Sequence, residues 1–411
     1  MLMCWCTCTK AEQIGGLNYS LNPEKHTAMV NRYNRWDGDL EIPSHVTYED
    51  SVYTVIAIEG SAFSGCNTLT RVRIPSTVMA IGERDYKNPF AECINLEAIE
   101  VDSCNEWMCS VDGVLFNRDT TQLWCYPAGA KQEKYVFPES VTWIGGSAFC
   151  GNSYLKELRL PDRINHISSC AFYRCENIES LTLPSGLTYI SASMCREMPS
   201  LRSVTIPSSV KGMGEYAFGW CTSLESIVLP EGLNSLVGET FYSCTSLKSV
   251  ELPSTCSVTE AMFYKCSALT DVKISNGVKV ISSSAFAHCT SLRILDIPAS
   301  VSYMGYYLFT GCKLDAIVIR GTLELSKPSR LIFKDLDTST PIYTLPSQVS
   351  AIKEIYAGPV YSLDKYNEHS NIPQTAKADI NQGSFYDLNG RKVDVPQEGI
   401  YIIKGKKVIL K

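Results

Sequence analysis

The chain has few of the residues and segments from which many functional sites are built. Its 411 residues include only 5 His, and no apolar run approaches the roughly 20 residues that a membrane-spanning helix needs. Its 37 Lys and Arg nearly balance 43 Asp and Glu, which leaves a formal net charge of −6. Nucleic-acid-binding domains are usually basic, so this balance argues against DNA or RNA as a partner.

Sequence motifs for catalysis are also missing. The chain has no His-Glu-x-x-His pair for zinc, no Gly-x-Ser-x-Gly nucleophile elbow and no Gly-x-x-x-x-Gly-Lys loop for phosphate. His288 adjoins Cys289, and a cysteine nucleophile needs such a base, but Cys289 belongs to a repeated core position. The sequence therefore predicts a protein that is not an enzyme and that uses no metal or other cofactor.

A repeat of about 23 residues runs through most of the chain, and such a period decides the fold. Arg84–Lys87 reads as a four-residue insertion that lengthens one interval to 27 residues. Ten units result, marked by Phe63, Phe90, Phe149, Phe172, Phe218, Phe241, Phe263, Phe286 and Phe309, with Cys195 in the place of the aromatic residue between Phe172 and Phe218.

Each unit carries a segment of the form Leu-x-x-Leu-x-Ile, whose alternation predicts a short strand with one face inward. Pro often follows and ends the strand, as at Pro161 and Pro253. A single unit cannot bury its own apolar side, whereas stacked units share one continuous core. We therefore expect a β-rich solenoid of about ten stacked units with short parallel strands and irregular caps. Any helix beside the repeated aromatic residue should be short or 3₁₀.

The Leu-x-x-Leu-x-Ile-Pro, Val-x-x-Ile and Ala-Phe-x-x-Cys segments resemble the BspA-type leucine-rich repeats of bacterial surface proteins, over residues 40–320. The resemblance implies a protein that a Bacteroidetes-like bacterium secretes or displays on its surface. It also implies adhesion to, or recognition of, host or bacterial proteins and glycoproteins through the solenoid face. A structural envelope protein that self-associates is the alternative function, and a hydrolase sited in an insertion at 102–146 is a third.

The remaining segments set the expected domain boundaries. Residues 1–11 have the short apolar character of a truncated signal peptide or leader, although the basic start is missing; a chain that is not exported by that route is the alternative. Residues 12–60 should form an N-terminal cap with a degenerate first repeat, before the solenoid at 61–320 and a C-terminal cap at 321–363. Residues 364–384 are polar and indicate a linker.

The tail, residues 385–411, is expected to form two β-hairpins, the first around Asn389-Gly390. It resembles the closing motif of C-terminal sorting domains in secreted proteins of the Bacteroidetes, which implies a role in export and surface attachment. A small β-module without a sorting role is the alternative.

The insertion at 102–146 contains a strand that turns at Asp112-Gly113 and is answered by residues 122–127. One interpretation is a β-hairpin spliced into the stack. The other is a functional finger made of Trp107, Phe116, Trp124 and Tyr126.

Cysteine is abundant: the chain has 18 Cys but only 5 His. Neighbouring cysteines in parallel strands point the same way, which disfavours the dihedral angle of a disulfide, so we expect buried free thiols. Cys104 and Cys109 flank the hairpin and are candidates for a disulfide, whereas Cys4, Cys6 and Cys8 could bind a soft metal. Eight cysteines lie three residues after the repeated aromatic residue: Cys66, Cys93, Cys175, Cys221, Cys244, Cys266, Cys289 and Cys312.

Residues beside the inward strand positions should project from the face of the strand ladder and form a stripe along it. The middle of this stripe is rich in Ser and Thr, and both ends are charged. Open solenoid faces of this kind are typical recognition surfaces, although a solvated face without a ligand has the same pattern. The candidate ligand-binding residues are Arg71, Arg73, Glu157, Arg159, Glu251, Asp271 and Lys273.

Overall fold

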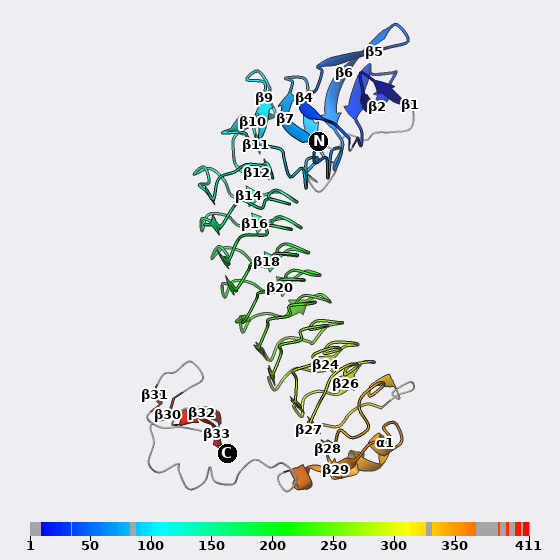
Figure 1. Ribbon diagram of the computed structural model, residues 1–411, viewed down its shortest axis with the longest axis vertical. Helices are drawn as coiled ribbons and strands as arrows, with labels where there is room; N and C mark the ends of the chain where they lie inside the picture. The colour runs from blue at the N-terminus through cyan, green and yellow to red at the C-terminus, as the bar shows by residue number, and fades with distance from the viewer. Residues whose placement is uncertain are drawn as a thin grey trace. The chain divides into compact units, whose positions relative to one another are not determined.

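The computed structural model describes residues 10–33, 35–82, 88–325 and 331–366, together with four strands between residues 385 and 410 (Figure 1). The chain divides into two compact units, Met1–Val360 and Tyr361–Lys411. Residues 1–9, which include Cys4, Cys6 and Cys8, lie outside the described residues, as does most of the expected linker at 364–384. No helix in the described part of the chain is long and apolar enough to cross a membrane.

The first unit is a β-solenoid of about 13 turns at intervals of about 23 residues, which confirms the predicted fold class. The expected count of ten is too low because less regular segments also join the parallel ladders. Strand β4 (Gly38–Glu41) precedes the regular repeats and pairs with β7 (Leu69–Ile74). Strand β28 (Ile342–Thr344) follows them and pairs with β27 (Ala316–Ile319).

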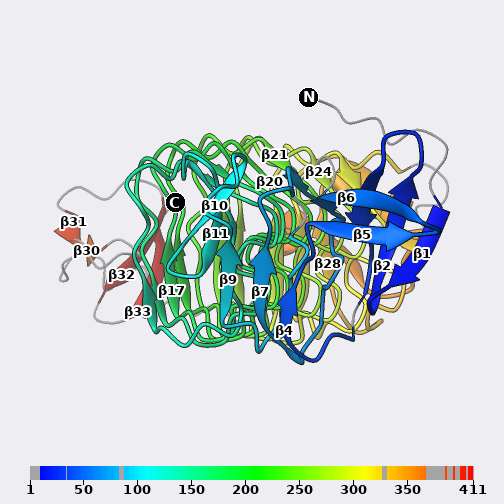
Figure 2. The same ribbon diagram turned by 90° about the horizontal axis from the view of Figure 1, so that it is seen from above.

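The Leu-x-x-Leu-x-Ile segments form the first ladder of parallel strands. Their side chains alternate between exposed and buried, as in β22 and β23, because one face meets the core and the other meets solvent. In Figure 2 the strands β4, β7 and β9 lie side by side. Besides the strands already given, this ladder contains β9 (Ala98–Val101), β13 (Lys134–Tyr135), β15 (Glu157–Leu158), β17 (Ser180–Thr182), β19 (Ser203–Thr205), β22 (Ser249–Leu252), β23 (Asp271–Ile274) and β25 (Ile294–Ile297).

The Val-x-x-Ile segments form the second ladder, in strands of two residues. In most of these strands the second residue, such as Ile144, Ile167 or Ile190, is buried in the core, and the residue before it faces outward. The strands are β14 (Trp143–Ile144), β16 (His166–Ile167), β18 (Tyr189–Ile190), β20 (Gly212–Met213), β21 (Ser235–Leu236), β24 (Val280–Ile281) and β26 (Tyr303–Met304).

The Ala-Phe-x-x-Cys segments form tight turns on a third side of the solenoid. The cysteine amide donates to the carbonyl of the phenylalanine three residues earlier, for example Cys244 N to Phe241 O at 3.2 Å. The phenylalanine rings are fully buried and stack from turn to turn. Phe218 and Phe241, Phe241 and Phe263, and Phe263 and Phe286 each have ring centroids 5.7 Å apart.

The repeated cysteines link each turn to the one before it. Their thiols are free, and all eight residues are buried, which confirms the prediction of buried free thiols. Each Sγ donates a hydrogen bond of 3.0–3.2 Å to a backbone carbonyl of an earlier turn, as from Cys244 to Phe218 O. Asn152 takes the cysteine position after Phe149, and its Nδ2 donates to the carbonyl of Ala128 at 3.1 Å. A buried hydrogen-bond donor thus occupies this position in nine of the ten units, and Met198 fills it in the unit of Cys195.

The N-terminal end is covered by a sheet that the sequence analysis did not foresee. Residues 10 and 11, assigned to the leader, form the start of its first strand. Alternating burial along β2 shows that one face of the sheet covers the open end of the core. The sheet has the order β1-β2-β3-β6-β5, with β8 beside β6; its strands are β1 (Lys10–Ile14), β2 (Leu17–Asn22), β3 (Thr27–Val30), β5 (His45–Tyr48), β6 (Ser51–Ile58) and β8 (Ala80–Ile81).

The insertion forms three antiparallel strands, β10 (Met108–Val111), β11 (Val114–Asn117) and β12 (Gln122–Cys125). The first two make the expected hairpin at Asp112-Gly113. The third pairs in parallel with β14 and so returns the chain to the second ladder.

The end of the first unit contains a short α-helix, α1 (Val349–Lys353), after a 3₁₀ turn η2 (Pro346–Gln348). The second unit begins within β29 (Val360–Ser362), continues through η3 (Leu363–Lys365) and carries a small antiparallel sheet. The sheet order is β31-β30-β32-β33, with β30 (Phe385–Tyr386), β31 (Lys392–Val393), β32 (Gly399–Ile403) and β33 (Lys406–Leu410). Both expected hairpins are present, although Asn389 and Gly390 lie outside the described residues. The sorting role of this tail stays a prediction.

Removal of one buried thiol should weaken the stack. We expect Cys244→Ala to lower the free energy of unfolding by about 1–3 kcal/mol, because it leaves a small cavity and deprives the carbonyl of Phe218 of a donor. Cys104→Ala, at an exposed thiol, should change it by less than about 0.5 kcal/mol. Chemical denaturation followed by circular dichroism measures both values. Equal effects of the two substitutions would contradict the structural role.

Burial also makes the stability depend on alkaline pH. It raises the pKa of Cys125, Cys221 and Cys266 to about 12, from an ordinary value of 9.0. The folded chain holds these protons more tightly than the unfolded chain, so their stabilisation is complete below about pH 9 and is lost as the pH rises toward 12. We expect the denaturation midpoint to fall across this interval, and less steeply in Cys221→Val. Identical slopes for the variant and the parent protein would be the contrary result.

Candidate functional site

The structure exposes the predicted stripe on the first ladder, but most of its charges are already paired. Arg73 lies 2.9 Å from Glu100 on the neighbouring strand, and Arg71 lies 3.5 Å from the same carboxylate. Lys273 is in an ion pair with Glu251. These pairs form because the charge at equivalent positions changes sign from one turn to the next. The sequence of a single unit does not show this alternation.

The other end of the predicted stripe is paired in the same way. Glu157 accepts from Arg159 at 2.6 Å and from Lys134 on the neighbouring strand at 2.5 Å. Asp271 is exposed at the start of β23. Exposed pairs of this kind contribute little stability, but they cancel the local charge that would attract a charged partner from a distance. The ligand-binding role of the seven predicted residues therefore stays a prediction.

The turn side of the solenoid carries a second set of projecting side chains. Two residues after the repeated aromatic position, the backbone has a positive φ in all ten units, for example +57° at Arg174, +58° at Trp220 and +62° at His288. Left-handed backbone favours glycine, and Gly65, Gly151 and Gly311 occupy the same position in other turns. Large side chains therefore occupy a left-handed backbone position that favours glycine. Residues in such unfavourable backbone conformations are common at functional sites.

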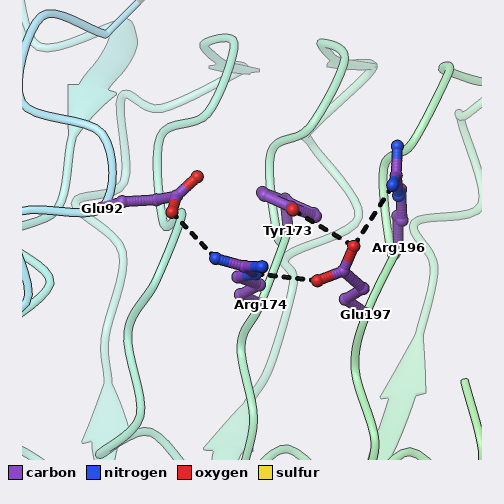
Figure 3. A network of polar contacts seen from close by, with 5 residues as sticks. All are labelled: Glu92, Tyr173, Arg174, Arg196 and Glu197. Atoms are coloured by element: carbon purple, nitrogen blue, oxygen red, sulfur yellow. Dashed lines mark hydrogen bonds and ion pairs between the residues drawn. The ribbon is translucent and has the colours of Figure 1, made fainter. Parts of the chain in front are cut away.

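Residues from three turns, those of Phe90, Phe172 and Cys195, form a polar network on this side (Figure 3). Arg174 bridges two carboxylates, with its guanidinium 2.8 Å from Glu197 and 3.0 Å from Glu92. Tyr173 donates from its hydroxyl to Glu197 at 3.2 Å, and Arg196 lies 3.3 Å from the same carboxylate. Glu197 therefore holds a tyrosine and two arginines in fixed positions on the surface.

The network shifts the pKa values of its members. The hydrogen bond to Glu197 raises the pKa of Arg174, so the guanidinium stays charged. Burial alone would raise the pKa of Glu197, but the bond and the charge of Arg174 lower it below its ordinary value of 4.5. Burial, with a further contribution from Glu197, raises the pKa of Tyr173 to about 12. At neutral pH Arg174 is therefore a cation, Glu197 a carboxylate and Tyr173 a neutral phenol.

Aromatic rings extend the network along the next turns. The Arg196 guanidinium lies 4.5 Å from the ring centroid of Trp220 and 5.1 Å from that of Tyr216, within the range of cation–π attraction. Trp220 then contacts Tyr242 at 4.7 Å, and Tyr242 stacks on Tyr264 at 4.8 Å. His288 meets Tyr264 edge-on at 5.2 Å. We call the surface from Tyr173 to His288 the turn-face stripe; its members are Tyr173, Arg174, Arg196, Glu197, Tyr216, Trp220, Tyr242, Tyr264 and His288.

A shallow hollow opens in this stripe, lined by Arg174, Glu176, Glu197, Pro199 and Trp220. It brings an aromatic ring, a cation and carboxylates to one place, which suits the recognition of polar and charged side chains of a partner. No nucleophile with an adjacent base lines it. In the described part of the chain, no group of three or more His, Cys, Asp or Glu is placed to hold a metal ion.

The turn-face stripe cannot be recognised in the sequence because the residues that form it differ from turn to turn. The one available signal was glycine at the same position in three other units. The alternative interpretation of the insertion, an aromatic finger, is wrong, since Phe116 and Tyr126 are buried and, of its four members, only Trp107 is exposed. The suggested disulfide of the insertion is also wrong: Cys104 and Cys109 are free, and Cys109 Sγ donates to the carbonyl of Asn117.

The strain of the left-handed backbone at Trp220 can be tested by measuring the free energy of unfolding of two variants. Trp220→Gly and Trp220→Ala remove the same ring contacts, but only alanine retains a Cβ atom at φ +58°. We expect Trp220→Gly to be the more stable of the two by roughly 0.5–1 kcal/mol, since the greater freedom of glycine in the unfolded chain offsets part of the relief. Chemical denaturation measures the difference. A less stable glycine variant would show that the position carries no backbone strain.

A family model and several solved structures match this chain. The model of the BspA type leucine rich repeat region matches six copies, at residues 44–110, 125–219 and 189–315. A search of curated proteins gives no match. Three of the solved structures that match are a leucine rich cell surface protein from Faecalibacterium prausnitzii and leucine-rich repeat proteins from Bacteroides ovatus and Eubacterium ventriosum.

The Faecalibacterium protein is 23% identical over 84% of this chain and 98% of its own, with a TM-score of 0.42. The Bacteroides protein is 25% identical over 81% and 99%, with a TM-score of 0.40, and the Eubacterium protein is 16% identical over 74% and 95%, with a TM-score of 0.41. The family model covers more than half of this chain. On its repeats and its solenoid, the chain belongs to the BspA-type leucine-rich repeat family.

Proposed function

We propose that the protein is a non-enzymatic recognition or adhesion protein that binds host or bacterial proteins or glycoproteins through the turn-face stripe. The proposal places it at the cell surface or among secreted proteins, in keeping with the surface proteins that its repeats resemble. Binding would rest on many surface contacts spread over several turns, as is typical of solenoids, and would need no cofactor.

One observation carries the proposal: Trp220, Arg174 and His288 occupy left-handed positions that glycine fills in other turns. A turn needs none of these side chains in order to fold, as Gly65 and Gly311 show at the same position. Tryptophan, tyrosine and arginine are also the residues that contribute most to binding energy at protein interfaces. Their concentration over neighbouring turns favours a binding surface over a solvated one.

The predicted stripe on the first ladder is the second candidate surface. Its charges are exposed, so a partner could still exchange pairs such as Arg73–Glu100 for contacts of its own. The turn-face stripe is favoured because its aromatic rings offer apolar area as well as charge, and buried apolar area is the larger source of binding energy.

The test is a binding assay of the full chain against purified extracellular-matrix proteins, mucin and whole bacterial cells. We expect saturable binding to at least one of these, weakened at least tenfold by the double substitution Arg174→Gly and Trp220→Gly. Tenfold corresponds to about 1.4 kcal/mol, within the range of interface hot spots. Glycine is chosen because the backbone at both positions already has a positive φ.

The matched control is the double substitution Arg71→Ala and Lys273→Ala on the first ladder, which should leave binding within about twofold. If the control abolishes binding and the glycine variant does not, the site belongs to the predicted stripe instead. If nothing in the panel binds and the protein assembles with itself in analytical ultracentrifugation, the structural envelope role replaces recognition.

A further inference from the structure

The outer face of the second ladder carries three aromatic side chains at one position of three successive turns. They are Trp143 on β14, His166 on β16 and Tyr189 on β18, at intervals of 23 residues. Neither the turn-face stripe nor the predicted stripe of the first ladder includes them. We call this surface the aromatic platform.

The first two rings are held in contact and in place. The ring centroids of Trp143 and His166 are 4.3 Å apart. Trp143 Nε1 donates to Ser168 Oγ at 3.1 Å, and His166 Nε2 lies 3.2 Å from the same hydroxyl. One serine therefore fixes both rings, and neither depends on a ligand for its position.

The third ring lies over a glycine in the next turn. A Cβ atom at Gly212 would approach Tyr189 Cε2 to 2.8 Å, which means that the ring occupies the space above that backbone. Tyr189 is nevertheless 42% exposed. A ring that rests on backbone on one side and meets solvent on the other is available for stacking.

Charged side chains are scarce at the outward positions of the platform strands, although Asp162 and Arg163 are exposed in the turn before His166. The outward residue beside each ring is Thr142, Asn165 or Thr188, and Asn234 lies further along the same face; the last three are exposed. In the four turns from residue 142 to residue 212, Lys211 is the single charged residue at these outward positions. Burial lowers the pKa of His166 below its ordinary value of 6.5, so its ring is neutral at pH 7.

This combination excludes several ligand classes. Stacking of nucleic-acid bases on aromatic rings is accompanied by a positively charged groove for the phosphates, which is not present here. Stable protein interfaces need about 800 Å² from each partner with an apolar centre, more than three rings among amides and hydroxyls provide. Neutral hydroxyl and amide groups beside aromatic faces match an uncharged polyol.

We infer that the aromatic platform is a binding site for an uncharged glycan chain. The C–H faces of pyranose rings would lie against the negative faces of the aromatic rings. The sugar hydroxyls would exchange hydrogen bonds with Asn165, Thr188 and Asn234. Successive turns are about 4.8 Å apart, so a linear glycan along the solenoid would meet one ring after another.

Titration calorimetry of the full chain tests the inference, with cellohexaose, xylohexaose, mannohexaose and maltohexaose as probes and hexagalacturonate as an acidic comparison. We expect at least one neutral hexasaccharide to bind with a dissociation constant on the order of 1 mM or tighter, which corresponds to about −4 kcal/mol. Trp143→Ala and Tyr189→Ala should each weaken it at least tenfold. Tyr189→Phe keeps the ring and should retain binding within about threefold.

Tyr303 provides the matched control, because it is 38% exposed on β26 at the same position of a distant turn. Tyr303→Ala should leave binding unchanged, and circular dichroism should show that every variant is folded. The inference is overturned if no neutral hexasaccharide binds, if both alanine variants at the platform bind like the parent, or if only hexagalacturonate or a protein binds there. The turn-face variants Arg174→Gly and Trp220→Gly should not affect these titrations, so the two proposals fail independently.

Discussion

Each turn of this protein is completed by its neighbours, because about 23 residues cannot enclose an apolar core of their own. Phenylalanine rings such as Phe241 and Phe263 stack 5.7 Å apart, and each repeated thiol donates to a carbonyl of an earlier turn. The abundance of cysteine follows from this arrangement: a small apolar side chain with one hydrogen-bond donor fits a buried corner that recurs in every turn. Asn152 meets the same demand with an amide.

The same stacking determines what the surface can do. A position that repeats every turn forms a column of side chains along the solenoid, and the three sides differ in what their columns contain. On the first ladder, charges of opposite sign alternate and pair, as in Arg73 with Glu100. On the turn side, Glu197 fixes Arg174 beside Trp220, and aromatic rings continue the stripe. The second ladder adds a neutral platform around Tyr189.

The inward positions could be predicted from the sequence because the same residue types recur there in most units. Phe241, Cys244 and Leu247 are examples, and all three are buried. Sequence reasoning did not identify the turn-face stripe, because Arg174 and Trp220 occupy the same position of the repeat but have side chains of different chemical type. Their projection depends on a positive φ, which a sequence shows only indirectly through glycines elsewhere. The N-terminal sheet was missed for a related reason, since residues 10–58 follow no regular period and terminal units are atypical.

Hydrogen exchange of backbone amides, with and without a partner captured from the binding panel, tests the location of recognition most directly. We expect slower exchange in the turn segments 173–176, 196–199 and 219–222, with little change in the strands of the first ladder. Protection confined to β7, β9, β22 and β23, with no change in those turns, would contradict this expectation.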